Sequence, residues 1–493
     1  MSITMDLKNK LSDEELKILA DLKYKEQKSS YGRISCKKKR YTTDEIRYAR
    51  LCTQLYSKRV ALSMDNRLTQ LNLNTIVLGG SGSGKSRYFV KPNILQANSS
   101  IVVTDPSGEL LMSCGKFLEE QGYVVKVFNI EDMSNSMRYN PFAYVHEDAD
   151  IPLMVDTIVS NLEGMVKPKG ANIFWDEALR TLLIAVCGYL FETQPMEKRN
   201  FTNVARLLEL MDVDENSEAE KDELDKLFDD LEEADPTSYA VSNYKVIKSA
   251  GRGETAQNIS ITTLSKISRF FKLKKIANLT YKDELNLDEI GQRKCALFVI
   301  TPQANTTYNF LAAELYTQLF DLLYKQGVKN AKRRHTTCVE VDMPVRFLID
   351  EAGNIGTIPR LENVMSTCRK YNISISLIYQ NMAQVQTLFE KKWEILVGNC
   401  DTMLFLGGID PSTVKLISER LGKQTINTIN TSKTTGNKGS GSKSKQSIGR
   451  NLMFTSEIEQ MDNDKCIVFI RSMKPFMDFK YPLESFLYDL NRD

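Results

Sequence analysis

A glycine-rich stretch, LGGSGSGKS at residues 78–86, has the residue types and spacing of a phosphate-binding loop. It fits the pattern GxxxxGKS, and it stands between an apolar run and a helical pattern. Glycines allow backbone N–H groups to converge on phosphate oxygens at a helix N-terminus. A glycine turn with no ligand is the alternative. We expect the loop to bind ATP through Gly79, Gly80, Ser81, Gly82, Ser83, Gly84, Lys85 and Ser86.

Two residues of this loop have distinct chemical roles. Lys85 would reach the β- and γ-phosphates, and the hydroxyl of Ser86 would ligate Mg²⁺. A second ligand is needed to hold the metal, and VRFLIDE offers one where its apolar run ends. Asp350 would complete the Mg²⁺ shell, and Glu351 would polarise the attacking water. Simple helix capping by these two acids is the alternative.

Two further residues complete the candidate site. Gln380 ends the run ISISLIYQ, where an amide can sense the γ-phosphate or orient water, although it would also suit an ordinary strand end. Arg369, in STCRKYNIS, would supply positive charge to the transition state in a neighbouring subunit. A solvated or salt-bridged side chain is the alternative for this arginine.

Short apolar runs rich in β-branched residues predict the strands that position these groups. NTIVLGG and SSIVVTDPSGEL flank a helical pattern, and YVVKVFNI follows another. Further strands are predicted within residues 294–302, 344–356, 373–381, 401–408 and 465–472. Strands that alternate with helices form parallel sheets covered on both faces. The sequence therefore predicts an α/β protein with a mostly parallel central sheet.

The pattern changes in three other segments. Residues 150–277 have only helical periods, which predicts an all-α domain inserted into a nucleotide-binding domain of residues 71–149 and 278–493. Residues 1–70 are predicted to be helical, with a basic run, Lys37–Arg40, that would contact DNA or anionic lipid, or would only be solvated. Residues 431–447, TSKTTGNKGSGSKSKQS, carry too little apolar surface to order and predict a flexible loop.

Composition limits the remaining possibilities. The chain has 493 residues, and its 65 lysines and arginines nearly cancel its 63 aspartates and glutamates, so any basic surface must be local. Nine cysteines without CxxC spacing predict reduced thiols in a cytoplasmic protein, and we predict no metal beyond the nucleotide's Mg²⁺. The longest apolar run, LLIAVCGYLF, is shorter than the about 20 residues that cross a bilayer.

Together these stretches resemble the type IV coupling protein family, the VirD4/TraG-like ATPases of conjugative transfer. The likeness extends from about Leu71 to the C-terminus, and it also includes FWDEALRTLL and WEILVGNCDTMLFLGG. It implies a RecA-like P-loop NTPase fold interrupted by an all-α domain. It also implies a ring-shaped hexamer at the cytoplasmic base of a secretion channel, with nucleotide between neighbouring subunits. The family's site roles would fall on Lys85, Ser86, Asp350, Glu351, Gln380 and, as a finger acting in trans, Arg369.

Two features depart from the family pattern. Ser107, in DPSGE, replaces a lysine that the family often has, which puts any role for a charge there in doubt. Family members usually begin with transmembrane helices, and this chain shows none. It would therefore dock on a separate membrane anchor subunit, be a variant without an anchor, or have its anchor outside this sequence.

The resemblance implies an ATP-hydrolysing coupling protein that recruits a relaxase–DNA complex and drives single-stranded DNA into a type IV secretion channel during conjugation. Its partners would be copies of itself, relaxase and relaxosome proteins, single-stranded DNA and channel components, at the cytoplasmic face of the membrane. Two alternatives stay open: a nucleotide-gated receptor or docking scaffold for protein cargo, and a double-stranded DNA pump of the FtsK/HerA type.

Overall fold

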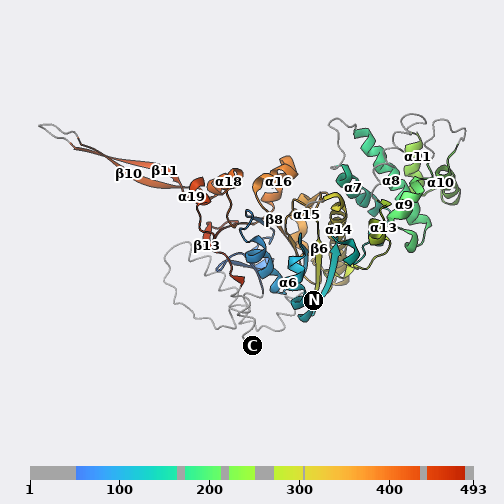
Figure 1. The fold of residues 1–493 in the computed structure, drawn as a ribbon, viewed down its shortest axis with the longest axis horizontal. Helices are drawn as coiled ribbons and strands as arrows, with labels where there is room; N and C mark the ends of the chain where they lie inside the picture. Colours follow the sequence, from blue (N-terminus) through green and yellow to red (C-terminus); the bar gives the residue numbers. More distant parts are fainter. Residues whose placement is uncertain are drawn as a thin grey trace. The chain divides into compact units, whose positions relative to one another are not determined.

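The computed structural model describes residues 52–163, 173–211, 221–249, 271–303, 306–433 and 441–483 (Figure 1). The helices expected before residue 52, and the basic run Lys37–Arg40, lie outside these residues. The chain divides into two compact units. Of the described residues, unit 1 contains those within Ala97–Ile375, and unit 2 contains those up to Gln96 and those from Ser376 onward. Each unit is described by itself, and the division into a nucleotide-binding domain and an all-α domain stays a prediction.

Nine strands form one mostly parallel sheet in the order β13-β12-β9-β3-β8-β7-β4-β6-β5. Among the described ladders of this sheet, β12 pairs antiparallel with β9 and with β13, and the other pairings are parallel. Strands buried along their whole length, such as β3 and β4, suit a parallel sheet covered on both faces. The α/β prediction is confirmed. The strands are β3 (Thr75–Leu78), β4 (Ser100–Thr104), β5 (Val124–Asn129), β6 (Cys295–Ile300), β7 (Val345–Ile349), β8 (Ile373–Tyr379), β9 (Thr402–Phe405), β12 (Lys465–Ile470) and β13 (Phe476–Phe479).

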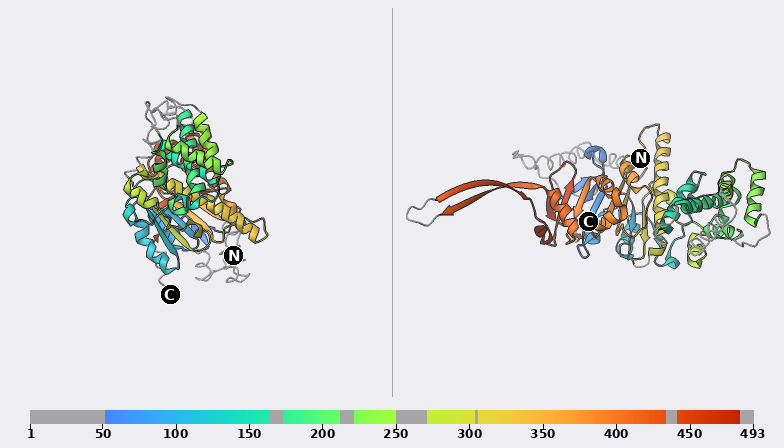
Figure 2. Two further views of the ribbon diagram at one scale, coloured as in Figure 1. Left: turned by 90° about the vertical axis from the view of Figure 1, so that its right-hand side faces the viewer. Right: turned by 90° about the horizontal axis from the view of Figure 1, so that it is seen from above.

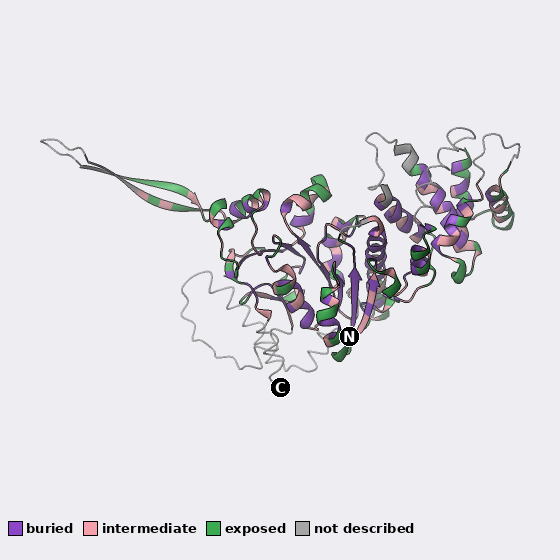
Figure 3. Ribbon diagram, in the orientation of Figure 1, coloured by how far each residue is buried: buried purple, intermediate pink, exposed green. Residues whose placement is uncertain are grey.

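In unit 1, two helical connections build the sheet. Helix α6 (Glu109–Glu120) follows β4, and α14 (Phe310–Arg333) lies between β6 and β7 in sequence. The ring of Phe320 on α14 lies 4.4 Å from that of Phe347 on β7. The hydroxyl of Tyr316 is 2.6 Å from that of Thr104 on β4. Helix α14 is therefore fixed against β7, which follows it in sequence, and against the neighbouring strand β4. Figure 3 shows this buried face and the buried strands in purple.

Between β5 and β6 the regular elements of the described chain are helices, as the fold prediction requires. Helix α7 packs against α14 and α8, and α8 packs against α11. The apolar run LLIAVCGYLF lies within α8, where Leu182 and Val186 are fully buried. The stacked rings of Phe228 and Tyr244, 3.9 Å apart, join α10 to α11. The α-helices are α7 (Asp150–Glu163), α8 (Ile173–Thr193), α9 (Phe201–Leu208), α10 (Glu223–Ala234), α11 (Tyr239–Ser249) and α13 (Lys274–Thr280).

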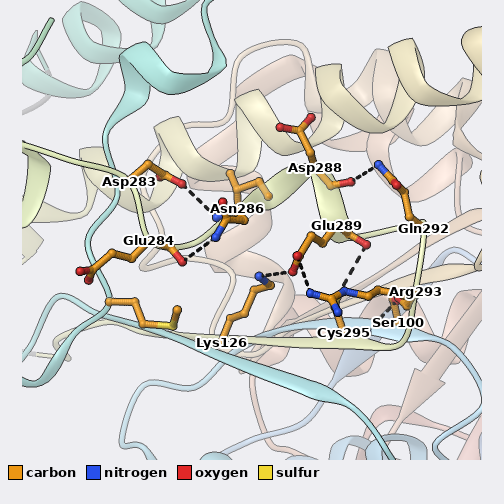
Figure 4. A network of polar contacts seen from close by, with 12 residues as sticks. Ser100, Lys126, Asp283, Glu284, Asn286, Asp288, Glu289, Gln292, Arg293 and Cys295 are labelled. Atoms are coloured by element: carbon orange, nitrogen blue, oxygen red, sulfur yellow. Dashed lines mark hydrogen bonds and ion pairs between the residues drawn. The ribbon is translucent and has the colours of Figure 1, made fainter. Parts of the chain in front are cut away.

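A polar network holds the chain where it returns from these helices to the sheet (Figure 4). Lys126 on β5 is buried, and its Nζ lies 2.7 Å from a carboxylate oxygen of Glu289. Glu289 also pairs with Arg293, and the Arg293 carbonyl accepts a hydrogen bond of 2.6 Å from Ser100 Oγ on β4. A buried lysine is tolerated because its charge is paired. The network thereby joins the segment before β6 to strands on either side of it.

In unit 2, β3 is the strand that leads into the glycine-rich loop. It pairs in parallel with β9, and Thr75 is opposite Thr402. It also pairs in parallel with β8, with Thr75 opposite Ser376. Fixed on both sides, β3 supports the loop rigidly. The α-helices of this unit are α4 (Asn66–Thr69), α5 (Lys91–Leu95), α16 (Met382–Phe389), α17 (Trp393–Gly398), α18 (Pro411–Leu421) and α19 (Thr455–Glu459).

The expectation of helix throughout residues 1–70 is wrong where the chain is described. β1 (Thr53–Leu55) and β2 (Ala61–Ser63) form an antiparallel hairpin, and only the four-residue α4 is α-helical there. Gln54 is fully buried and donates a hydrogen bond of 2.9 Å to Thr75 on β3. This long-range contact stabilises an extended conformation that a local helical period could not predict.

The expectation of a loop at residues 431–447 also needs correction. β10 (Lys423–Lys433) and β11 (Gly441–Asn451) are paired antiparallel, with Lys423 opposite Asn451 and Lys433 opposite Gly441. The strands extend away from α18 and α19 of the same unit (Figures 1 and 2). The prediction considered only apolar burial, whereas this ribbon is ordered by its backbone ladder. Residues 434–440 lie outside the described chain.

Candidate nucleotide-binding site

The glycine-rich loop of unit 2 has the backbone of a phosphate-binding loop. Gly82 has φ +75° and Gly84 has φ +81°, which L-residues with a side chain rarely adopt. A Cβ on Gly84 would also lie 2.3 Å from the ring of Tyr88. The N–H of Gly80 donates to the carbonyl of Gly407, at 2.9 Å, and anchors the start of the loop beyond β9. Glycine is therefore required at position 84 by both torsion and space.

Lys85 and Ser86 follow at the start of a helix. Nζ of Lys85 bends back into the loop and donates to the carbonyls of Gly79, at 2.8 Å, and Gly80, at 3.3 Å. Ser86 opens a π-helical turn, Ser86–Val90, which continues into α5 with Pro92 in its first turn. The loop thus places an ammonium group and a hydroxyl beside the amino end of a helix, where anions bind favourably.

A second lysine, which the sequence did not single out, supports the loop. Lys480, directly after β13, is 4 % exposed, and its Nζ donates to the Ser83 carbonyl at 2.8 Å. The same Nζ lies 3.2 Å from Oδ1 of Asn463 and 5.5 Å from the ring centroid of Tyr88. Burial is the main cause that lowers the pKa of Lys480. No motif reveals this contact, because almost 400 residues separate Lys480 from Ser83 in sequence.

The residues of the loop fit a metal-bound nucleoside triphosphate. Left-handed glycines at 82 and 84 keep the backbone free of Cβ atoms, and no atom lies within 4 Å of a Cβ built on Gly82. Phosphate is an anion, and the loop offers a lysine ammonium but no carboxylate between Gly79 and Ser86. A serine hydroxyl is a hard oxygen ligand of the kind that Mg²⁺ prefers.

Asp350 and Glu351 lie in unit 1, at the end of the buried strand β7. Asp350 is 5 % exposed, and its Oδ1 accepts a hydrogen bond of 3.0 Å from the N–H of Glu351. Glu351 has φ +48°, a conformation that costs energy for a residue with a side chain and is often found at functional sites. Its Oε2 accepts a hydrogen bond of 3.1 Å from Asn354. The two acids therefore face different surroundings, although they are neighbours in sequence.

The other predicted residues divide between the units. Gln380 is half-buried in unit 2, and its N–H donates to Oε1 of Gln384, at 3.1 Å, in the first turn of α16. Arg369 is half-buried in unit 1, in a short 3₁₀ turn, Cys368–Tyr371, that leads into β8. Ser107 is exposed in the turn between β4 and α6. Each predicted residue thus follows or precedes a strand, and their roles in catalysis stay predictions.

Comparison with known proteins now places the chain. The family model described as type IV secretory system conjugative DNA transfer matches residues 20–481, which is nearly all of the sequence. The chain belongs to this family. The resemblance to type IV coupling proteins is therefore confirmed. Among the residues that the structure describes, no helix combines the length and the apolar character needed to cross a membrane.

Curated relatives are similar at low identity. The conjugal transfer protein TraG of Rhizobium radiobacter is 23 % identical over 415 residues, which cover 81 % of this chain and 60 % of TraG. The type IV secretion system-coupling protein VirD4 of Bartonella henselae (strain ATCC 49882 / DSM 28221 / CCUG 30454 / Houston 1) is 24 % identical over 422 residues, covering 81 % of this chain and 61 % of VirD4. The chain thus spans about 60 % of the length of these relatives.

Solved structures share the fold of this family member. The bacterial conjugative coupling protein TrwBdeltaN70 superposes with a TM-score of 0.62 at 15 % identity, covering 86 % of this chain and 87 % of TrwBdeltaN70. TrwB in complex with ADP and Mg²⁺ gives a TM-score of 0.61 at 15 % identity, covering 87 % and 88 %. At sequence identities this low, the structural similarity shows a shared fold and nothing further.

Proposed function

We propose that this chain is an ATP-hydrolysing coupling protein that recruits a relaxase–DNA complex and drives single-stranded DNA into a type IV secretion channel. The observation that carries the proposal is the geometry of the loop after β3, where Gly82 and Gly84 are left-handed and Nζ of Lys85 donates to the carbonyls of Gly79 and Gly80. Membership of the conjugative DNA transfer family supports a role in DNA transport. That TrwB has been solved with ADP and Mg²⁺ supports the same nucleotide chemistry here.

In this proposal the residues of the site have separate tasks. The backbone of residues 79–86 and Nζ of Lys85 would bind the phosphates, while the Ser86 hydroxyl and the Asp350 carboxylate would hold the metal. When bound, Mg²⁺ supplies charge that neutralises the phosphate oxygens. Glu351 accepts a proton from the attacking water, because it follows the buried strand β7 in a strained conformation suited to a functional group.

Gln380 and Arg369 would complete the reaction. An amide at the end of β8 can orient water or sense the γ-phosphate, and an arginine can stabilise the charge that develops on the transferred group. Arg369 would act on the nucleotide of a neighbouring subunit, within a proposed hexamer. The other proposed partners are relaxosome proteins, channel components and a separate membrane anchor subunit, which would hold the chain at the cytoplasmic face of the membrane.

ATP turnover by the purified chain tests the proposal. The rate is measured alone, with a single-stranded oligonucleotide and with a duplex of the same length. We expect single strands to stimulate turnover most. In Lys85→Ala turnover should fall by roughly 10²–10³-fold, because the cation that meets the phosphates is lost. Lys415→Ala, an exposed position on α18, is the matched control and should keep the wild-type rate.

Other outcomes identify the alternatives. Stimulation by duplex alone would indicate a double-stranded DNA pump. A Lys85→Ala chain that still supports conjugative transfer in cells would indicate a docking scaffold, because transfer would then not require hydrolysis.

Mixed subunits test whether Arg369 acts in trans. Arg369→Ala and Lys85→Ala chains are each expected to be inactive. If neighbours share a site, mixing them places an intact arginine beside an intact loop at some interfaces and restores part of the turnover. No recovery at any mixing ratio would contradict a shared site.

A further inference from the structure

The β10–β11 hairpin of unit 2 has one face that contains all the lysines of its two strands. Directly opposite residues of an antiparallel pair lie on the same face, and successive residues alternate between faces. The register pairs Lys423 with Asn451, Lys433 with Gly441, Thr431 with Lys443 and Ile429 with Lys445. Positions 423, 433, 443 and 445 therefore share a face. We call this set the lysine face.

The hairpin contains no carboxylate that could neutralise these charges. Residues 423–451 contain five lysines, one arginine and no aspartate or glutamate. The arginine, Arg450, belongs to the opposite face and is paired at 2.5 Å with Glu457 of α19. Residues 423–451 therefore carry a net positive charge of their own, although the chain as a whole is almost neutral. A local basic surface of this kind attracts an anionic partner.

The structure also favours an extended, hydrophilic partner. Lys423, Thr425, Asn427, Lys445 and Ser447 are all exposed on the lysine face. Hydroxyl and amide groups next to lysines suit the oxygens of phosphodiesters. An isolated two-stranded ribbon of mostly polar residues has marginal stability in water. The ribbon extends away from α18 and α19, which favours a contact surface over a role in the core (Figure 1).

We propose that the lysine face binds the phosphate backbone of a nucleic acid. A protein partner fits less well, because interface cores are depleted in lysine and enriched in aromatic residues, and residues 423–451 contain no aromatic residue. The lack of aromatic side chains also removes stacking on bases. Contact with phosphates alone therefore predicts binding without sequence preference. The inference rests on the proposed function, because it assigns the contact with transported DNA to a specific element.

The test measures the salt dependence of DNA binding by the full chain, using the fluorescence anisotropy of a labelled 30-nucleotide single strand. The variant carries Lys423→Gln, Lys433→Gln, Lys443→Gln and Lys445→Gln. Each phosphate contact contributes about 0.7 to the slope of log K against log salt, so four contacts contribute about 2.8. Between 50 and 200 mM salt, wild type should therefore lose about 50-fold more affinity than the variant.

A second variant controls for net charge. It carries four Lys→Gln substitutions at exposed positions outside the hairpin, namely Lys116, Lys329, Lys391 and Lys415. It has the same net charge as the hairpin variant and should keep the wild-type slope. Circular dichroism and thermal unfolding confirm that both variants fold. The inference would be overturned if the hairpin variant and the wild type had equal salt slopes. It would also be overturned if the salt slope fell equally in the two variants.

The outcomes separate this inference from the proposed function. If the wild-type chain hydrolyses ATP and binds DNA but the hairpin variant keeps the full salt slope, only the assignment of DNA binding to the lysine face is contradicted. If the wild-type chain shows a salt slope that depends on the hairpin but no ATP turnover, only the proposed ATP-driven transport is contradicted. Vesicles of phosphatidylglycerol form the last arm: loss of vesicle binding in the hairpin variant with unchanged DNA binding would assign the face to a lipid surface and overturn the inference.

Discussion

Replacing Lys480 by methionine should weaken nucleotide binding without touching the loop sequence. Methionine keeps most of the apolar stem of lysine and removes the ammonium group. The change deletes the hydrogen bonds from Nζ to the Ser83 carbonyl, at 2.8 Å, and to Asn463, at 3.2 Å. Ser83 directly precedes Gly84 and Lys85, so its carbonyl fixes the peptide that turns toward the phosphates.

The size of the effect follows from burial. A hydrogen bond from a charged donor contributes about 1.5–3 kcal/mol to stability. Part of this is offset, because a buried ammonium is costly and removing it relieves its desolvation. Lys480 is 4 % exposed, so the offset is substantial. We expect a net loss of about 1–2 kcal/mol, which is a factor of about 5–30 in an equilibrium constant.

A fluorescent nucleotide analogue measures the dissociation constant, and steady-state turnover separates KM from kcat. Lys480→Met should raise Kd and KM by about 5–30-fold and change kcat little, because Lys480 holds the loop through the Ser83 carbonyl. Lys480→Arg keeps the charge and should restore part of the affinity. Lys415→Met, exposed on α18, should behave as wild type. Wild-type nucleotide affinity in Lys480→Met would refute the argument that this contact supports the loop.

Three further changes have definite expected outcomes. Gly84→Ala should lower nucleotide affinity at least tenfold in a binding titration, because its φ is +81° and its Cβ would meet Tyr88 at 2.3 Å; Gly398→Ala, where no atom lies within 4 Å, should have no effect. Glu351→Gln should abolish turnover and leave nucleotide binding unchanged, so retained turnover would remove Glu351 as the base. Burial raises the pKa of Glu314 well above its ordinary value of 4.5. Above pH 4.5 the folded state therefore keeps a proton that the unfolded state releases. The free energy of unfolding is highest below pH 4.5 and falls as the pH rises toward the pKa of the folded state. Glu314→Gln should remove this dependence and be more stable than wild type at about pH 8 but not at about pH 4, as denaturant unfolding would measure; parallel pH profiles for the two proteins would contradict the assignment.

The local sequence pattern was sufficient to predict much of the sheet and the glycine-rich loop. The runs at 74–80 and 373–381 contain β3 and β8, because stretches rich in β-branched residues suit strands that are buried on both faces. The spacing of Gly84, Lys85 and Ser86 was also sufficient to predict the loop. A phosphate-binding turn needs its glycines and its lysine at fixed offsets within one short segment, so that its chemistry is written in adjacent residues.

Contacts between distant residues were decided only by the tertiary structure. Lys480 meets Ser83 because β13 and the loop belong to the same folded unit, and no local property of FKYP indicates this contact. Gln54 adopts a strand because it bonds to Thr75 in the core, against the helical period of its neighbours. The lysine face exists only because the register of β10 and β11 places residues of separate strands on one side. Sequence determines the chemistry of a segment, whereas long-range pairing decides which segments meet.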